Sequence, residues 1–227
     1  MKPEIIKTAD GSHSLYLREL DEHYHSVHGA IQEGKHVFIE MGLTSSPALL
    51  LKEKGEISIL EIGLGTGLNV FLTYLEHLKK PVHINYTALE AFPLNAEIIA
   101  QLNYVELLNA KQHQAAFNMI HESMWEQAVE LDKNFSLHKI KNTLQEVVFE
   151  KQFDIIYFDA FGPRVQPDMW TEEVFTKTYA ATKPNGFLVT YCAKGEVKRT
   201  LKKVGFTVET LKGPPGKREM VRAVKNN

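Results

Sequence analysis

The feature that most constrains this chain is a short apolar segment followed directly by closely spaced glycines. Residues 57–62 are rich in isoleucine and have the composition of a buried parallel strand. The sequence GLGTG follows at residues 63–67, and leucines then recur at helical spacing over residues 68–78. Glycines between a strand and a helix permit a tight turn and the close approach of a ligand to the backbone. We therefore expect an α/β fold with a binding site at this turn.

Strands and helices alternate along the rest of the chain. We expect further strands at residues 83–89, 135–140, 153–158 and 187–192. We expect helices at residues 95–125, from an N-cap at Thr171 to near Pro184–Gly186, and before a C-cap at Gly205. Residues 206–211 and 220–224 predict a terminal antiparallel strand pair. This alternation predicts a Rossmann-like α/β domain, with a mainly parallel sheet and helices on both faces.

The first fifty residues have a different pattern. Glu4–Leu20 predicts two strands joined by a turn at Asp10–Gly11, and His36–Glu40 predicts a short extended segment. We expect residues 1–50 to form a β-hairpin and cap packed on a core of residues 51–227. A length of 227 residues suits one domain overall.

Composition predicts a cytoplasmic protein with no membrane segment. The chain is 44% hydrophobic, without an apolar run near the ~20 residues that span a bilayer, and its opening lacks the core of a signal peptide. The single cysteine, Cys192, excludes an internal disulfide and fits a reducing compartment. It lies in an apolar run, so we expect a buried structural thiol. Nothing in the sequence indicates the oligomeric state.

Basic residues are concentrated at the end of the chain. The net charge is −2, yet residues 185–227 carry ten bases against three acids. Such a surface can meet a phosphate backbone, or it can be the solvated side of a helix and a strand edge. The bases that we consider for RNA contact are Lys198, Lys202, Lys217 and Arg218.

The glycine spacing favours S-adenosylmethionine over a dinucleotide. The pattern is GxGxG, and Leu68 stands where a dinucleotide site would need its last glycine. Glu90 closes the second strand of the core, where an acid can accept hydrogen bonds from both ribose hydroxyls. A tight turn needed only for packing remains the alternative.

A second candidate site follows the strand at residues 153–158. Asp159 ends this apolar strand at the sheet edge where α/β proteins bind ligands. Prolines, including Pro163, stiffen the loop, and Phe161 and Trp170 can flank a planar base. Alternatively, Trp170 is a core residue and Asp168 an N-cap. The spacing of the histidines at 23, 25 and 28 matches no recognised metal site, so we expect none.

Several motifs together resemble one family. DAFGPRVQPDMWTEEVF, LEIGLGTGLN, LEAFPL and KGPPGKREM closely resemble the methyltransferase half of the bifunctional bacterial tRNA-modifying enzyme MnmC, and DGSHSLYLRELDEHYHS and HVFIEMGL resemble its opening. The resemblance implies N-methylation of 5-aminomethyl-2-thiouridine at the tRNA wobble position, giving the methylaminomethyl nucleoside. It also implies a stand-alone, MnmD-like form without the FAD-dependent oxidase half.

The resemblance also assigns residues. It implies that Asp159 acts at the amine and that the cofactor is held by Glu61, Gly63, Gly65, Gly67 and Glu90. The family's acid near the adenine is replaced by Asn142, which can still hydrogen-bond the adenine amino group. A methyl- or aminopropyltransferase acting on a free small amine is the alternative, since such enzymes share the glycine loop and the acid.

Overall fold

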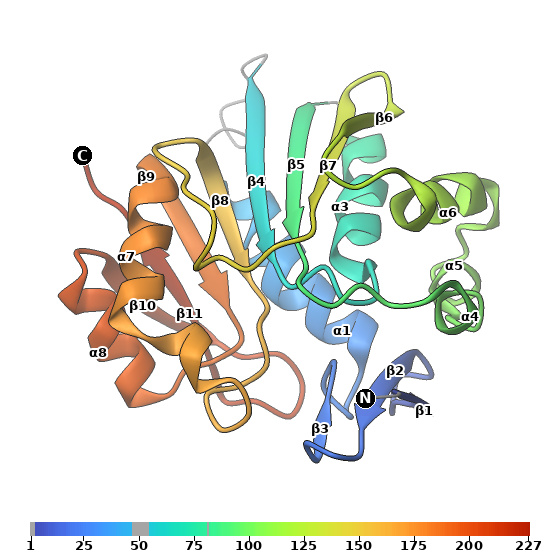
Figure 1. Cartoon of the computed structure of the whole chain (residues 1–227), viewed down its shortest axis with the longest axis horizontal. Coiled ribbons are helices and arrows are strands. Elements are labelled where there is room, and N and C mark those ends of the chain that lie inside the picture. The colour runs from blue at the N-terminus through green and yellow to red at the C-terminus, as the bar shows by residue number, and fades with distance from the viewer. Residues whose placement is uncertain (1–2, 47–54, 81) are drawn as a thin grey trace.

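The chain forms a large mixed sheet covered by helices, with a small sheet at one end, in a computed structural model that describes residues 3–46, 55–80 and 82–227 (Figure 1). The central strands are β4 (Glu56–Ile62), β5 (His83–Leu89), β7 (Phe135–Ile140), β8 (Phe153–Phe158) and β9 (Thr182–Thr190). They are parallel, in the order β9-β8-β4-β5-β7. The predicted Rossmann-like architecture is confirmed.

Antiparallel strands extend this sheet at both edges. β10 (Thr207–Lys212) pairs with β11 (Glu219–Val224), which pairs with β9. This is the predicted terminal pair. At the other edge, β6 (Ala128–Asp132) pairs with β7. We did not predict β6, whose acidic and apolar residues lie at a partly exposed edge.

Helices cover both faces of the large sheet (Figure 1). On one face, α3 (Leu68–Lys79) and α6 (Gln114–Glu122) pack with aromatic and isoleucine side chains of β4, β5 and β7. On the other face, α7 (Glu172–Ala181) and α8 (Gly195–Lys203) pack on β4, β8 and β9. The short helices α4 (Ala96–Ile99), α5 (Tyr104–Leu107) and η3 (Lys111–His113) precede α6, so the region predicted as helical is a series of short pieces.

The small sheet contains β1 (Glu4–Lys7), β2 (His13–Leu17) and β3 (Glu22–His23), all antiparallel. It lies beyond the carboxyl ends of the parallel strands (Figure 1). The predicted turn is present, with Gly11 at φ 87°. Asp10 and Ser12 in this turn accept hydrogen bonds from backbone N–H groups at the start of α1 (Ala30–Gly34). The expected boundary between residues 50 and 51 lies outside the described residues.

Two predictions of local structure were wrong. The segment predicted as extended at His36–Glu40 is a π-helix, η1 (Lys35–Glu40), that continues α1. Its consecutive apolar side chains Val37, Phe38 and Ile39 are all buried, which a helix can do in a crowded core. A short helix, η2 (Leu43–Ser45), follows.

The second error concerns the end of α7. This helix begins at the predicted N-cap, where the Thr171 side chain accepts from Val174 N, but it ends at Ala181. The fifth strand starts at Thr182 and includes Pro184–Gly186, the residues predicted to end the helix. The register with β8 shifts there, and Asn185 has φ 62°, so the turn-like residues form a bulge within the strand. Within the described residues, no helix is long and apolar enough to cross a membrane.

Candidate active site

The glycine loop joins β4 to α3 at the carboxyl edge of the sheet. Gly63, Gly65 and Gly67 all have positive φ, a conformation that favours glycine. A Cβ atom on Gly63 would lie 2.8 Å from the backbone oxygen of Asp159, and one on Gly67 would lie 2.8 Å from the His121 ring. The loop therefore packs closely on its neighbours while its outer side faces a cleft.

The cleft has a volume of about 300 Å³. Its walls come from the ends of β4, β5, β7 and β8 and from the segment after β3. The residues that line it include Tyr24, His25, Gly63, Gly65, Asn69, Glu90, Phe92, Asn142, Leu144, Asp159 and Phe161. A cleft at the carboxyl ends of parallel strands is where α/β folds bind cofactors.

Glu90 connects the end of β5 to the glycine loop. One carboxylate oxygen accepts from Gly65 N at 2.9 Å, and the other accepts from Phe92 N at 2.8 Å. Each oxygen retains a lone pair for a further donor. The predicted acceptor of ribose hydroxyls is thus fixed by two backbone N–H groups on the wall of the cleft.

Asn142, the residue predicted to contact adenine, lines the cleft directly after β7. Its side-chain oxygen accepts from Thr143 N at 2.8 Å. Leu144, which is buried, and Phe92, which is 80% exposed, line the same cleft. These apolar side chains suit a planar aromatic group, and Asn142 adds a polar contact beside them.

Asp159 directly follows β8 and lines the cleft. Its Oδ2 accepts from Asn69 Nδ2 at 2.8 Å. Burial is the main cause that raises the pKa of Asp159 to about 7, and the charge of Glu33 adds to it; the Asn69 hydrogen bond and Lys217 act in the opposite direction. A carboxylate with this pKa is a far better proton acceptor near neutral pH than an ordinary aspartate.

Glu61 lies beneath the cleft rather than in its wall. Its side chain is fully buried and reaches Asp159 only through Asn69, whose Nδ2 also donates to Glu61 Oε1 at 2.9 Å. Burial, followed by the charge of Asp159, raises the pKa of Glu61 well above its ordinary value. The prediction that Glu61 contacts the cofactor directly stays a prediction, and the position of Glu61 beneath the cleft argues against it.

The predicted substrate residues in the loop after β8 lie in different surroundings. Phe161 lines the cleft, whereas Trp170 in η4 (Pro167–Trp170) is only 7% exposed and packs on Phe158 at 5.0 Å between ring centroids. The indole N–H donates to Phe161 O at 2.7 Å. Trp170 therefore supports the loop from the core, the alternative considered above. Pro163 lies outside the cleft lining, and its contact with substrate stays a prediction.

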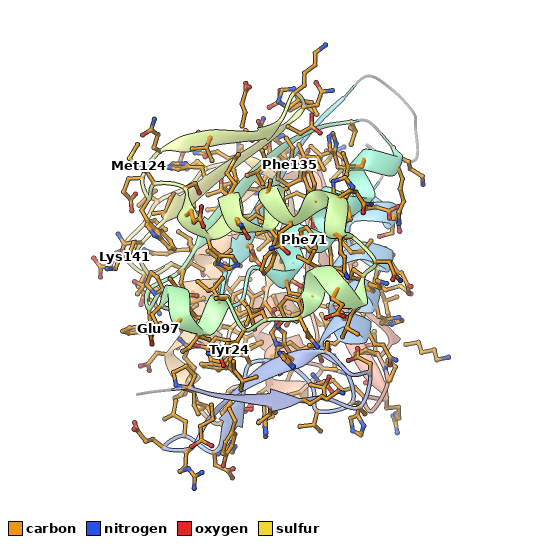
Figure 2. The ribbon with its side chains drawn as sticks, turned by 90° about the vertical axis from the view of Figure 1, so that its right-hand side faces the viewer. Tyr24, Phe71, Glu97, Met124, Phe135 and Lys141 are labelled. Carbon is orange, nitrogen blue, oxygen red and sulfur yellow. The ribbon has the colours of Figure 1, made fainter. Side chains whose placement is uncertain are left out.

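The N-terminal segment contributes residues that we did not predict. Tyr24 lies between the small sheet and the body of the molecule (Figure 2), edge-on to Phe161 at 5.1 Å and against Gly65. His25 lies 3.3 Å from the Thr66 hydroxyl, and burial lowers its pKa to about 4, so it is neutral at pH 7. No local sequence pattern identifies Tyr24 and His25 as residues of the site, because only the tertiary fold brings them to the glycine loop. In the described part of the chain, no three metal-binding side chains converge.

The predicted basic residues differ in how they are paired. Lys198 forms an ion pair with Glu219 at 3.1 Å, and Lys217 is paired with Glu33 and lies over the Tyr191 ring at 3.8 Å. Arg218 also contacts Glu219, but its side chain is 92% exposed, and Lys202 is exposed on α8. A second hollow of about 400 Å³ is lined by Tyr191–Lys194 and Lys217–Glu219. The Tyr191 hydroxyl donates to Ala160 O, so this hollow adjoins the loop of Asp159.

The fold and the cleft define a Rossmann-like class I methyltransferase, and comparison with known proteins identifies the family. The sequence profile of the S-adenosyl-L-methionine-dependent methyltransferase family matches residues 103–226, more than half of the chain. The chain belongs to this family, and S-adenosylmethionine is its cofactor. The residues present fit that group: glycines without Cβ atoms at the loop, the Glu90 carboxylate, and the apolar side chains of Phe92 and Leu144.

Curated relatives include the "tRNA 5-methylaminomethyl-2-thiouridine biosynthesis bifunctional protein MnmC" of two bacteria. The protein of Pseudomonas entomophila is 28% identical over 224 residues, covering 92% of this chain and 33% of the relative. The protein of Campylobacter hominis is 29% identical over 181 residues, covering 78% and 27%. The chain thus spans about one third of the length of these relatives.

Solved structures show the same fold. MNMC2 from Aquifex aeolicus superposes with a TM-score of 0.77 at 25% identity, covering 98% of this chain and 69% of that one. Spermidine synthase from Thermotoga maritima has a TM-score of 0.55 at 17% identity, covering 100% and 72%, which shows a shared fold alone.

The position of Glu90 leads to a test of cofactor binding. Glu90→Ala removes a hydrogen bond to a charged group worth ~1.5–3 kcal/mol, so we expect S-adenosylmethionine to bind roughly 10–100-fold more weakly. Isothermal titration calorimetry measures this, with Glu97→Ala on α4 as the control for an exposed acid. Wild-type affinity in Glu90→Ala would refute the assignment.

Proposed function

We propose that this enzyme N-methylates 5-aminomethyl-(2-thio)uridine at the wobble position of tRNA, giving the 5-methylaminomethyl nucleoside, in the cytoplasm. The observation that carries the proposal is Asp159, a carboxylate of raised pKa at the cleft and in the loop that resembles the MnmC family. The relatives named for tRNA 5-methylaminomethyl-2-thiouridine biosynthesis match about nine tenths of this chain.

The chemical difficulty is to present a neutral amine. An amine with the lysine pKa of ~10.4 costs about 4.6 kcal/mol to deprotonate at pH 7, and an amine attached to a uracil costs less. S-adenosylmethionine supplies an electrophilic methyl group on a positively charged sulfur. Asp159 accepts a hydrogen bond from the amine, directs the nitrogen lone pair into the cleft and takes up the proton that the amine loses. Asn69 keeps the carboxylate in place.

The surroundings of Asp159 suit a base extruded from RNA. Phe161 and Tyr24 present aromatic rings at the cleft, and an unstacked base packs on such rings. The basic hollow beside Tyr191 lies next to the same loop, where the phosphates of the flanking nucleotides would pass. Phe161 is therefore our candidate for contact with the base, and Lys202 and Arg218 are our strongest candidates for contact with phosphate.

A methyl- or aminopropyltransferase acting on a free small amine is less well supported. The similarity to spermidine synthase extends to the fold alone, at 17% identity. A free amine also has no need of an exposed basic surface. Transfer to putrescine or spermidine in the absence of tRNA would favour this alternative.

Substitution of Asp159 tests the proposed reaction directly. Asp159→Asn keeps size and polarity but removes the charge, so we expect methylation to slow by on the order of 10²-fold or more. The measurement is single-turnover transfer from labelled S-adenosylmethionine to undermodified tRNA, followed by nucleoside analysis. Asp21→Asn, at an exposed aspartate in the turn between β2 and β3, is the matched control and should react as wild type. Wild-type rates in Asp159→Asn would leave this residue no catalytic part.

Charge reversal tests the RNA surface. The double variant Lys202→Glu with Arg218→Glu should weaken tRNA binding and lower the salt dependence by about one unit of log–log slope for each phosphate that is no longer neutralised. Cofactor affinity should not change. Lys79→Glu on α3, whose side chain is 69% exposed, is the control reversal. If tRNA affinity and salt slope match the control, these bases are a solvated surface and another face binds RNA.

A further inference from the structure

Asn69 occupies an unusual position between two carboxyl groups. It is the second residue of α3, directly after the glycine loop, and is 4% exposed. Its side-chain nitrogen lies 2.9 Å from Glu61 Oε1 and 2.8 Å from Asp159 Oδ2. A primary amide has two N–H donors, and both are used on carboxyl groups. One residue of the first turn of α3 thus joins an acid of β4 to the acid that follows β8.

The orientation of Asn69 is restricted from both sides. The two carboxyl groups accept hydrogen bonds, so the nitrogen of the amide must face them. On the other side, a Cβ atom on Gly34 would lie 3.1 Å from Asn69 Oδ1, so the backbone of α1 packs directly against the amide. Asn69 cannot turn away without leaving the buried oxygen atoms unpaired.

Glu61 has few of the donors that an ionised carboxylate needs: Asn69 donates to its Oε1, and the Tyr86 hydroxyl lies close to it. Within the described residues, its second oxygen, Oε2, is buried without a hydrogen-bond partner, as are the hydroxyls of Tyr86 and Tyr157. An isolated charge in such a place is costly, and a buried carboxyl group keeps its proton instead. Burial and then the charge of Asp159 raise the pKa of Glu61, and they outweigh the Asn69 hydrogen bond and the nearby Tyr86 hydroxyl, which lower it.

We infer that Asn69 is a positioning residue that links Glu61 and Asp159 into one pair, in which Glu61 keeps its proton and Asp159 is the group that ionises. Its donated hydrogen bond holds Asp159 Oδ2 and leaves Oδ1 to meet the substrate amine. The catalytic meaning of this arrangement rests on the proposed methyl transfer, whereas the difference in protonation between Glu61 and Asp159 does not.

Other charged groups also act on Asp159. Glu33 in α1 raises its pKa, and Lys217 in the β10–β11 loop lowers it. These two side chains are paired with each other, so their effects on the pKa of Asp159 largely cancel. Glu90 and the hydroxyls of Tyr86, Tyr157 and Tyr191 complete the titratable groups around the pair. Asn69 differs from all of them because it is uncharged and contacts both carboxyl groups.

The test is a carboxyl ¹³C NMR titration of the full chain labelled at aspartate and glutamate. Asn69→Leu removes both donors at similar size, so we expect the pKa of Asp159 to rise by about one to two units. Glu61→Gln replaces a neutral acid by a neutral amide, so it should move the titration of Asp159 by less than about half a unit. Asn118→Leu, an exposed asparagine of α6, is the control.

The outcomes separate the inference from the proposed function. An unchanged titration of Asp159 in Asn69→Leu would overturn the positioning role, and a fall of a unit or more in Glu61→Gln would show that Glu61 is ionised. If the leucine variant does not fold, Asn69→Ser, which keeps one donor, must still shift Asp159 upward. The titration needs no substrate, so shifts as expected in a protein that does not methylate tRNA would leave the inference standing and remove the proposed function. In an active enzyme, the pH below which the single-turnover rate falls should rise together with the pKa of Asp159.

Discussion

The burial of carboxyl groups at one edge of the sheet is the interaction on which the rest of the structure depends. Glu61, Asp159 and Glu33 come from β4, the loop after β8 and α1, and they meet at the carboxyl ends of the parallel strands. Acids in such a place are costly unless donors reach them. The amide of Asn69 and the ammonium of Lys217 are those donors.

This requirement explains why distant parts of the chain converge. Lys217 lies in the β10–β11 loop, and its partner Glu33 lies in the N-terminal segment. The same two segments are in contact at Gly216, where a Cβ atom would clash with His28, and at His36, whose ring nitrogen lies 2.8 Å from Lys212 O. These contacts join the N-terminal segment to the β10–β11 loop, and the same N-terminal segment carries Tyr24 and His25, which line the cleft beside the glycine loop.

The strands, the glycine loop and the family were predictable from the sequence because they depend on local patterns. An apolar run such as residues 153–158 can only be a buried strand or helix, and GxGxG limits the turn that follows β4. The contributions of Tyr24, Asn69 and Glu33 were not predictable, because they arise from contacts between segments far apart in the chain. The π-helix at Lys35–Glu40 and the bulge at Pro184–Gly186 were mispredicted, since packing and strand register overrode local preference.

The central claim, that the fold holds Asp159 at a raised pKa, is tested most directly by protein stability as a function of pH. The folded pKa of about 7 lies above that of an unfolded aspartate, so the stability that Asp159 contributes is full below about pH 4 and is lost as pH rises to 7. The thermal midpoint of Asp159→Asn minus that of wild type, measured from pH 4 to 8, should therefore increase up to about pH 7 and then stay constant. A difference that is constant or falls over this range would contradict the account.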